Sequence, residues 1–212
     1  MNRILHILAK TMSVVFYPLF VPTYGIALFC YAYATQVQPM NVVWIAVTIG
    51  GTFVLTCLLP ITAIGILIKK GEVKDLYIND PRERTVPYLY AAMGFVFWSY
   101  LLLKILHAPL ALSCVAVGAT AAIGIVTLIN RRWKISAHLA GLGGLIGGIF
   151  SYCLSIGAIP TWGTLFLWLA LSLALMVARL YLDAHTPAQV CAGWLLGLAC
   201  TFLPYCLLYY VG

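Results

Sequence analysis

Two histidines and one arginine are the residues of this chain best suited to chemistry. Arg179 is followed by five residues and then His185, and His138 lies forty-one residues before Arg179. Ionisable side chains are costly beside lipid and are usually retained there for a function. One imidazole can attack phosphorus, a second can protonate a departing alkoxide, and cations can bind the phosphoryl oxygens. These residue types predict chemistry on a phosphate carried by a lipid.

The composition is that of an integral membrane protein. The 212 residues are 64% hydrophobic and 8% charged, and the mean hydropathy is +1.03. A soluble domain would carry about 25% charged residues. The length suits a single domain over residues 1–212. The net charge of +7 predicts no nucleic-acid partner, because the cations lie between apolar runs and form no basic stripe with exposed aromatic residues.

The apolar runs predict an all-α, polytopic bundle of six or seven transmembrane helices, since a spanning helix needs about 20 apolar residues. Pro18 and Pro22 should kink the first of them or make it partly re-entrant. The expected spans are 13–34, 42–68, 87–106, 109–129, 138–157, 162–182 and 188–211.

Three polar stretches should meet at one face of the membrane. Two helices separate residues 69–86 from 130–138, and two more separate these from 179–189, so the chain returns each time to the same side. Eleven of the twelve Lys and Arg residues lie on that side, and only Lys104 lies on the other. The positive-inside rule then places the site toward the cytoplasm of a multi-pass protein, expected in a bacterial inner membrane.

Three short patterns resemble the signatures of the type 2 phosphatidic acid phosphatase superfamily, which are K-x6-RP, PSGH and SR-x5-H-x3-D. The third is similar to Arg179, five residues, His185, three residues and Gln189. The second is similar to Ser136 and His138, without its Pro and Gly. The first is matched loosely by Lys74, Arg82 and Arg84. Together they cover residues 70–195 in order.

This resemblance implies a metal-independent lipid phosphatase without a cofactor. His185 would be the nucleophile that forms a phosphohistidine, and His138 would be the acid and later the base. Arg179 would bind phosphate. The other residues implied to bind the substrate phosphate are Lys74, Arg82, Arg84, Lys134 and Ser136, with backbone amides at the start of the next helix. The substrate would be phosphatidic acid, phosphatidylglycerol phosphate or polyprenyl pyrophosphate.

Gln189 is the main departure from the pattern. The superfamily has an aspartate at this position, which holds the nucleophilic histidine in one tautomer. A glutamine oxygen can accept a hydrogen bond from the imidazole, so we expect Gln189 to orient His185, although it brings no charge. Asp183 is the nearest carboxylate in the sequence, two residues before His185, but residues two apart on a helix point in different directions.

Several other readings stay open. His138 and His185 could be polar residues at helix ends, at the level of the lipid headgroups. Arg131 and Arg132 suit binding to anionic membrane lipids. The alternative functions are a member that binds lipid phosphates without hydrolysing them, a lipid phosphotransferase, and a small transporter, although no internal repeat with matched broken helices is evident. The glycines between residues 141 and 148 predict close helix packing.

Overall fold

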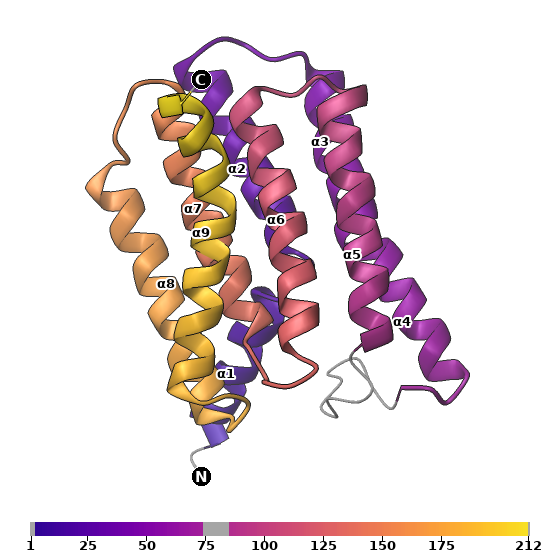
Figure 1. Cartoon of the computed structure of the whole chain (residues 1–212). Helices are drawn as coiled ribbons and strands as arrows, with labels where there is room; N and C mark the ends of the chain where they lie inside the picture. The colour runs from indigo at the N-terminus through magenta and orange to yellow at the C-terminus, as the bar shows by residue number, and fades with distance from the viewer. Residues whose placement is uncertain (1–2, 74–84, 212) are drawn as a thin grey trace.

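The computed structural model describes residues 3–73 and 85–211, and the regular structure within them is helical (Figure 1). In this part of the chain, six helical segments are long and apolar enough to cross a membrane. This confirms the all-α, multi-pass bundle. The segments are Val42–Lys69, Thr85–Ile105, Leu110–Ile129, Ala137–Ser155, Trp162–Tyr181 and Pro187–Tyr210.

Each segment begins and ends within two residues of the range expected from hydropathy. The first is α3 (Val42–Phe53) and α4 (Leu59–Lys69), joined by a π-helical turn. Pro60 lies just after this turn and has no N–H to donate backward, so the ladder of helical bonds is rearranged there. The remaining helices are α5 (Thr85–Tyr100, continued by a π-turn), α6 (Leu110–Ile129), α7 (Ala137–Ser155), α8 (Trp162–Tyr181) and α9 (Pro187–Val211).

The expected first span, 13–34, is interrupted at the prolines as expected, but its bounds are wrong, because it forms two separate helices and the first begins ten residues earlier. The chain forms α1 (Arg3–Val15), turns at residues 16–20, and continues as α2 (Val21–Gln36). Pro18 explains the break, because it cannot donate to the preceding turn. α1 carries Arg3, His6 and Lys10 among apolar residues, and it exposes apolar side chains such as Ile4 and Leu8. These features are typical of a helix that lies in the membrane interface.

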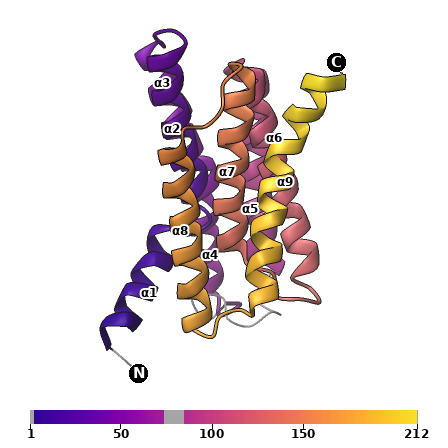
Figure 2. The same cartoon turned by 90° about the vertical axis from the view of Figure 1, so that its left-hand side faces the viewer.

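The connections alternate between the two ends of the bundle (Figures 1 and 2). α1, the α6–α7 turn and the α8–α9 turn lie at the end where α4 finishes and α5 begins. The α2–α3, α5–α6 and α7–α8 connections lie at the opposite end. The helices that carry the candidate residues therefore present them at one face, as the count of crossings predicts.

Glycines allow α7 and α9 to pack backbone against backbone. A Cβ atom built on Gly197 would overlap the Ala140 carbonyl, and one built on Gly193 would overlap the Ser136 carbonyl. Gly143 faces the backbone of α9 in the same way. The predicted close packing of the α7 glycines is confirmed, and it fixes the start of α7 against the first turns of α9.

Candidate active site

His185 lies in the turn between α8 and α9, and its ring is held by a backbone carbonyl of another loop. Its Nδ1 is 3.0 Å from the carbonyl oxygen of Lys134, in the α6–α7 connection. A carbonyl oxygen only accepts, so Nδ1 carries the proton in the neutral ring. The lone pair is therefore on Nε2. This is the tautomer that a histidine nucleophile needs.

The turn that carries His185 is built by local sequence. Asp183 adopts a left-handed backbone conformation (φ 48°), which aspartate tolerates better than most residues. Thr186 and Gln189 then begin α9 by reciprocal bonds. The Thr186 amide donates to Gln189 Oε1 at 3.0 Å, and the Gln189 amide donates to Thr186 Oγ1 at 3.4 Å. This is a capping box, with Pro187 at the first helical position.

The Gln189 side chain thus takes part in the capping of α9. Its side-chain oxygen is bonded to Thr186, and its backbone carbonyl accepts from the Ser136 amide at 3.2 Å. Its effect on His185 is a small hydrogen-bonding contribution that raises the pKa of the ring. The orienting contact at Nδ1 comes from the Lys134 carbonyl. Asp183 is exposed, and no hydrogen bond between described residues joins it to His185.

His138 lies in the first turn of α7 and is held by α1. Its Nε2 is 3.1 Å from the Ser13 carbonyl, to which it must donate. The Tyr17 ring packs against the His138 ring in an edge-to-face arrangement, with ring centroids 5.6 Å apart. In the neutral ring Nδ1 then holds the lone pair, so this imidazole can accept a proton at Nδ1 and can give one from Nδ1 only when it is protonated on both nitrogens. His138 and His185 lie close enough to interact electrostatically.

Arg179 lies in the last turn of α8, where a cation is favourable at the helix C-terminus. Its Nη1 donates to Ser13 Oγ at 3.2 Å. Arg179 also lies near both imidazoles. The structure therefore brings together His138, His185 and Arg179, from three separate helical regions. This arrangement places a fixed positive charge beside both rings.

Ser13 is a site residue that the sequence did not indicate. It is 6% exposed, and it holds His138 through its carbonyl and Arg179 through its hydroxyl. The hydroxyl itself donates to Ala9, one turn earlier in α1. No pattern marks this serine, because it lies more than a hundred residues from both partners. The interfacial helix α1 is thus part of the site.

The start of α7 offers further donors. Ser136 is the N-cap residue, but its hydroxyl makes no capping bond, and it is buried without a hydrogen-bond partner among the described residues. The first amides of a helix also lack partners within the helix and attract anions. The amides beside His138 can therefore donate to a phosphate, whereas Ser136 is fully buried and its phosphate-binding role stays a prediction. Lys134, whose carbonyl holds His185, contributes positive charge near that ring.

The other predicted phosphate ligands, Lys74, Arg82 and Arg84, lie outside the described residues. Arg131 and Arg132 are exposed in the α6–α7 connection, consistent with contact to lipid headgroups. Within residues 3–73 and 85–211, no three His, Cys, Asp or Glu side chains form a metal-binding group. The expectation that no metal is required stays a prediction, which a chelator can test.

Burial of the His185 ring, followed by the positive charge of Arg179, lowers its pKa to about 4. The hydrogen bond to the Lys134 carbonyl opposes this shift. Because the pKa is lowered, the ring is neutral at neutral pH and becomes protonated only in acid. A neutral ring keeps the Nε2 lone pair that attack on phosphorus requires.

The lowered pKa predicts how His185 reacts with diethyl pyrocarbonate, which modifies only neutral imidazole. The modification rate should stay nearly constant between pH 7 and pH 5, because the ring is neutral at both. An imidazole with the ordinary pKa of about 6.5 would lose reactivity about 25-fold over that range. Mass spectrometry of the His185 peptide measures the rate, and a loss of that size would contradict the lowered pKa.

Comparison of the chain with known protein families, curated proteins and solved structures finds no match.

Ser13→Ala should lower turnover of a lipid phosphate about tenfold, because a hydrogen bond to a charged group contributes about 1.5 kcal/mol. The change removes the hydroxyl to which Arg179 Nη1 donates and leaves the backbone carbonyl that holds His138. We expect the loss mainly in kcat, with the helical content unchanged by circular dichroism.

Ser172→Ala is the matched control for this prediction. Ser172 is a buried serine on the same helix as Arg179, and its hydroxyl has no hydrogen-bond partner among the described residues. This variant should keep full activity. Equal losses in the two variants would mean that Ser13 acts only in folding.

Proposed function

We propose that this protein is a membrane-embedded lipid phosphate phosphatase that works through a phosphohistidine on His185. The observation that carries the proposal is the hydrogen bond between His185 Nδ1 and the Lys134 carbonyl at 3.0 Å. It leaves Nε2 unprotonated beside Arg179 and the start of α7. A nucleophile, a fixed cation and helix amides then converge at one end of the bundle.

The reaction would proceed in two steps. His185 Nε2 attacks phosphorus, and the bond from phosphorus to the lipid oxygen breaks. His138 enters this step as an imidazolium with a proton on each nitrogen, and it gives the Nδ1 proton to the departing alkoxide. His138 then accepts a proton from water as that water attacks the phosphohistidine. The phosphorus–nitrogen bond breaks, and inorganic phosphate and free His185 result. Arg179 neutralises charge on the phosphoryl oxygens in both steps.

The substrate would be a lipid phosphomonoester or pyrophosphate, with its headgroup at the histidines and its tail among the helices. The resemblance to the type 2 phosphatidic acid phosphatase signatures supports this class. The charge distribution supports a site on the cytoplasmic side. No described element supplies the aspartate of the third signature, but the Lys134 carbonyl supports the same tautomer of His185.

One observation favours a second candidate, a protein that binds lipid phosphates without hydrolysing them. A carboxylate would stabilise a positively charged His185, whereas Gln189 is neutral and its oxygen is bonded to Thr186. If the phosphohistidine cannot form, the same cations and amides would still bind a phosphate.

The test is phosphate release by the purified protein in detergent, with excess chelator. The lipids are dioleoyl phosphatidic acid, phosphatidylglycerol phosphate and undecaprenyl pyrophosphate. We expect release that the chelator does not reduce. Loss of release on chelation would contradict the metal-independent mechanism. Tight binding of these lipids with no release would favour the second candidate.

A further inference from the structure

The N-terminal helix α1 packs on the bundle along one narrow stripe. The buried residues of α1 are Ala9 and Ser13. The helix lies mainly against α8, where Met12 and Phe16, just after the helix, join an apolar core cluster. Figure 2 shows α1 leaning away from the bundle toward the N-terminus. The first two turns of α1 are therefore held on the bundle more weakly than its last turn.

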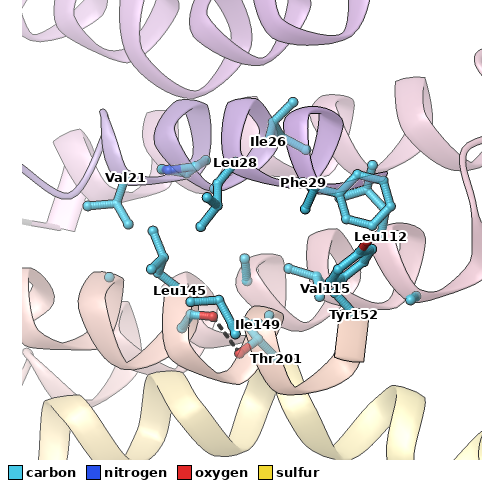
Figure 3. Close-up of a pocket in the computed structure, with 18 of the residues that line it drawn as sticks. Val21, Ile26, Leu28, Phe29, Leu112, Val115, Leu145, Ile149, Tyr152 and Thr201 are labelled. Atoms are coloured by element: carbon cyan, nitrogen blue, oxygen red, sulfur yellow. Dashed lines mark hydrogen bonds between the residues drawn. The ribbon is translucent and has the colours of Figure 1, made fainter. Parts of the chain in front are cut away.

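The next helix, α2, is anchored in the bundle. Its residues Val21 and Phe29 are buried, and Figure 3 shows them facing side chains of α6 and α7 across an apolar cavity. The Tyr24 hydroxyl of α2 donates to the carbonyl of Val15, the last residue of α1, at 3.0 Å. The C-terminal end of α1 is thus tied to an anchored helix, and the turns before it can pivot about that end.

Two kinds of exposed side chain cover the rest of α1. The exposed apolar side chains are Ile4, Leu5, Ile7, Leu8, Val14 and Val15. The cations Arg3 and Lys10 are also exposed, and their spacing of seven residues places them on one side of the helix, two turns apart. A helix that combines an apolar stripe with cations inserts into the membrane interface and favours anionic lipids. The charges therefore match an anionic bilayer surface.

Ser13 couples this surface of α1 to the candidate site. Its carbonyl accepts from His138 Nε2, and its hydroxyl accepts from Arg179 Nη1. Lys10 lies three residues before Ser13, which is about 4.5 Å along the helix axis. If α1 moved away from α8, the contacts to His138 and Arg179 would be lost together. The position of α1 therefore decides whether both side chains are oriented.

We propose that α1 binds the anionic surface of the surrounding membrane through Arg3 and Lys10, and that this binding seats α1 against α8 and completes the site. The partner is the headgroup layer of the bilayer, and not the lipid that is hydrolysed. Each cation beside an anionic surface strengthens membrane binding about fivefold, so the two together contribute about 30-fold. The effect on turnover rests on the proposed function, whereas the binding of α1 to the bilayer does not.

The first test measures turnover of para-nitrophenyl phosphate by the protein in nanodiscs. The bilayer is dioleoyl phosphatidylcholine, either alone or with a third of it replaced by dioleoyl phosphatidylglycerol, which is a phosphodiester and has no phosphomonoester to cleave. We expect turnover to rise about 5- to 30-fold in the anionic bilayer. An anionic surface repels this soluble substrate, so attraction of the substrate cannot produce the rise. Unchanged or lower turnover would overturn the proposal.

The double variant Arg3→Gln, Lys10→Gln assigns the effect to α1. It should abolish the rise and leave turnover in pure phosphatidylcholine unchanged. The matched control is Lys69→Gln, Lys70→Gln, which removes two exposed cations where α4 ends, at the same end of the bundle. This control should retain the rise. Equal loss in the two double variants would mean that the basic face as a whole responds, against the assignment to α1.

Ala9→Cys reports the position of α1 without any turnover. Ala9 is buried where α1 packs on the bundle, so a thiol there should react with a water-soluble maleimide only when α1 moves away. We expect labelling at position 9 to be at least about fivefold slower in the anionic nanodiscs, as measured by mass spectrometry of the peptide. Cys191, which is exposed on α9, is the internal control and should be labelled equally in both bilayers.

The outcomes separate this proposal from the proposed function. Slower labelling at position 9 with no phosphate release in either bilayer would retain the binding of α1 and overturn the phosphatase. Phosphate release with equal labelling in the two bilayers would do the reverse. If Ala9→Cys does not fold, hydrogen exchange of the α1 amides in the unchanged protein decides, because equal exchange in both bilayers would rule out the seating of α1 by anionic lipid.

Discussion

Phosphate release should fall at least about 10³-fold when His185 is replaced by asparagine, as expected for loss of a covalent nucleophile. Asparagine places an N–H where the histidine has Nδ1–H, so it can still donate to the Lys134 carbonyl. It has no equivalent of Nε2. The variant therefore removes the attacking atom and retains the contact that orders the α8–α9 turn. The measurement is steady-state phosphate release from the preferred lipid.

His107→Asn is the matched control. His107 is exposed in the α5–α6 connection, at the opposite end of the bundle. Its backbone has φ 45°, a conformation that asparagine tolerates. This variant should be fully active. Residual turnover of His185→Asn at a tenth of the unchanged protein or more would contradict the nucleophile assignment.

The covalent intermediate gives a second measurement on the same variants. A lipid labelled in its phosphate should transfer the label to the protein, and the adduct should survive an alkaline quench and be lost in acid. His107→Asn should be labelled, and His185→Asn should not. Label on a peptide that lacks residue 185 would identify a different nucleophile.

The transmembrane helices could be predicted from the sequence because each is an unbroken apolar run between polar turns. α1 could not be predicted in this way. An amphipathic helix at the membrane interface mixes residues such as Lys10 with apolar residues, and it produces no unbroken apolar run. Hydropathy therefore placed the first helix at residue 13, ten residues after the start of α1 at Arg3. The break at Pro18 was predictable, because it follows from the covalent structure of proline.

The site could be predicted in part. His138, His185 and Arg179 stand out because charged and polar side chains are rare in this chain. The contacts that orient the two histidines could not be recognised in the sequence. Lys134 and Ser13 make these contacts through backbone carbonyls, which every residue possesses. The Thr186–Gln189 capping box did have a sequence signal, a threonine followed three residues later by glutamine with proline between them. That pattern indicates a structural use of Gln189 in addition to any use at the histidine.

His138→Gln should reduce turnover of a lipid phosphate about 10²- to 10⁴-fold, the usual range for loss of a general acid–base residue. Glutamine places an N–H near the position of Nε2–H, so the bond to the Ser13 carbonyl can form, while the Nδ1 atom that takes and gives the proton is lost. The alkoxide of a lipid alcohol is a poor leaving group, and without that proton its departure should become rate-limiting.

A substrate whose leaving group needs no proton distinguishes between the two steps assigned to His138. Para-nitrophenolate leaves without a proton, so para-nitrophenyl phosphate should phosphorylate His185 in the His138→Gln variant at nearly the unchanged rate. The second step still needs a base to activate water, so the phosphohistidine should accumulate. The expected result is a burst of one nitrophenolate per protein, followed by slow turnover. Equal slowing of the burst and of the lipid reaction would instead mean that His138 only binds phosphate, and the acid would have to be sought elsewhere at the site.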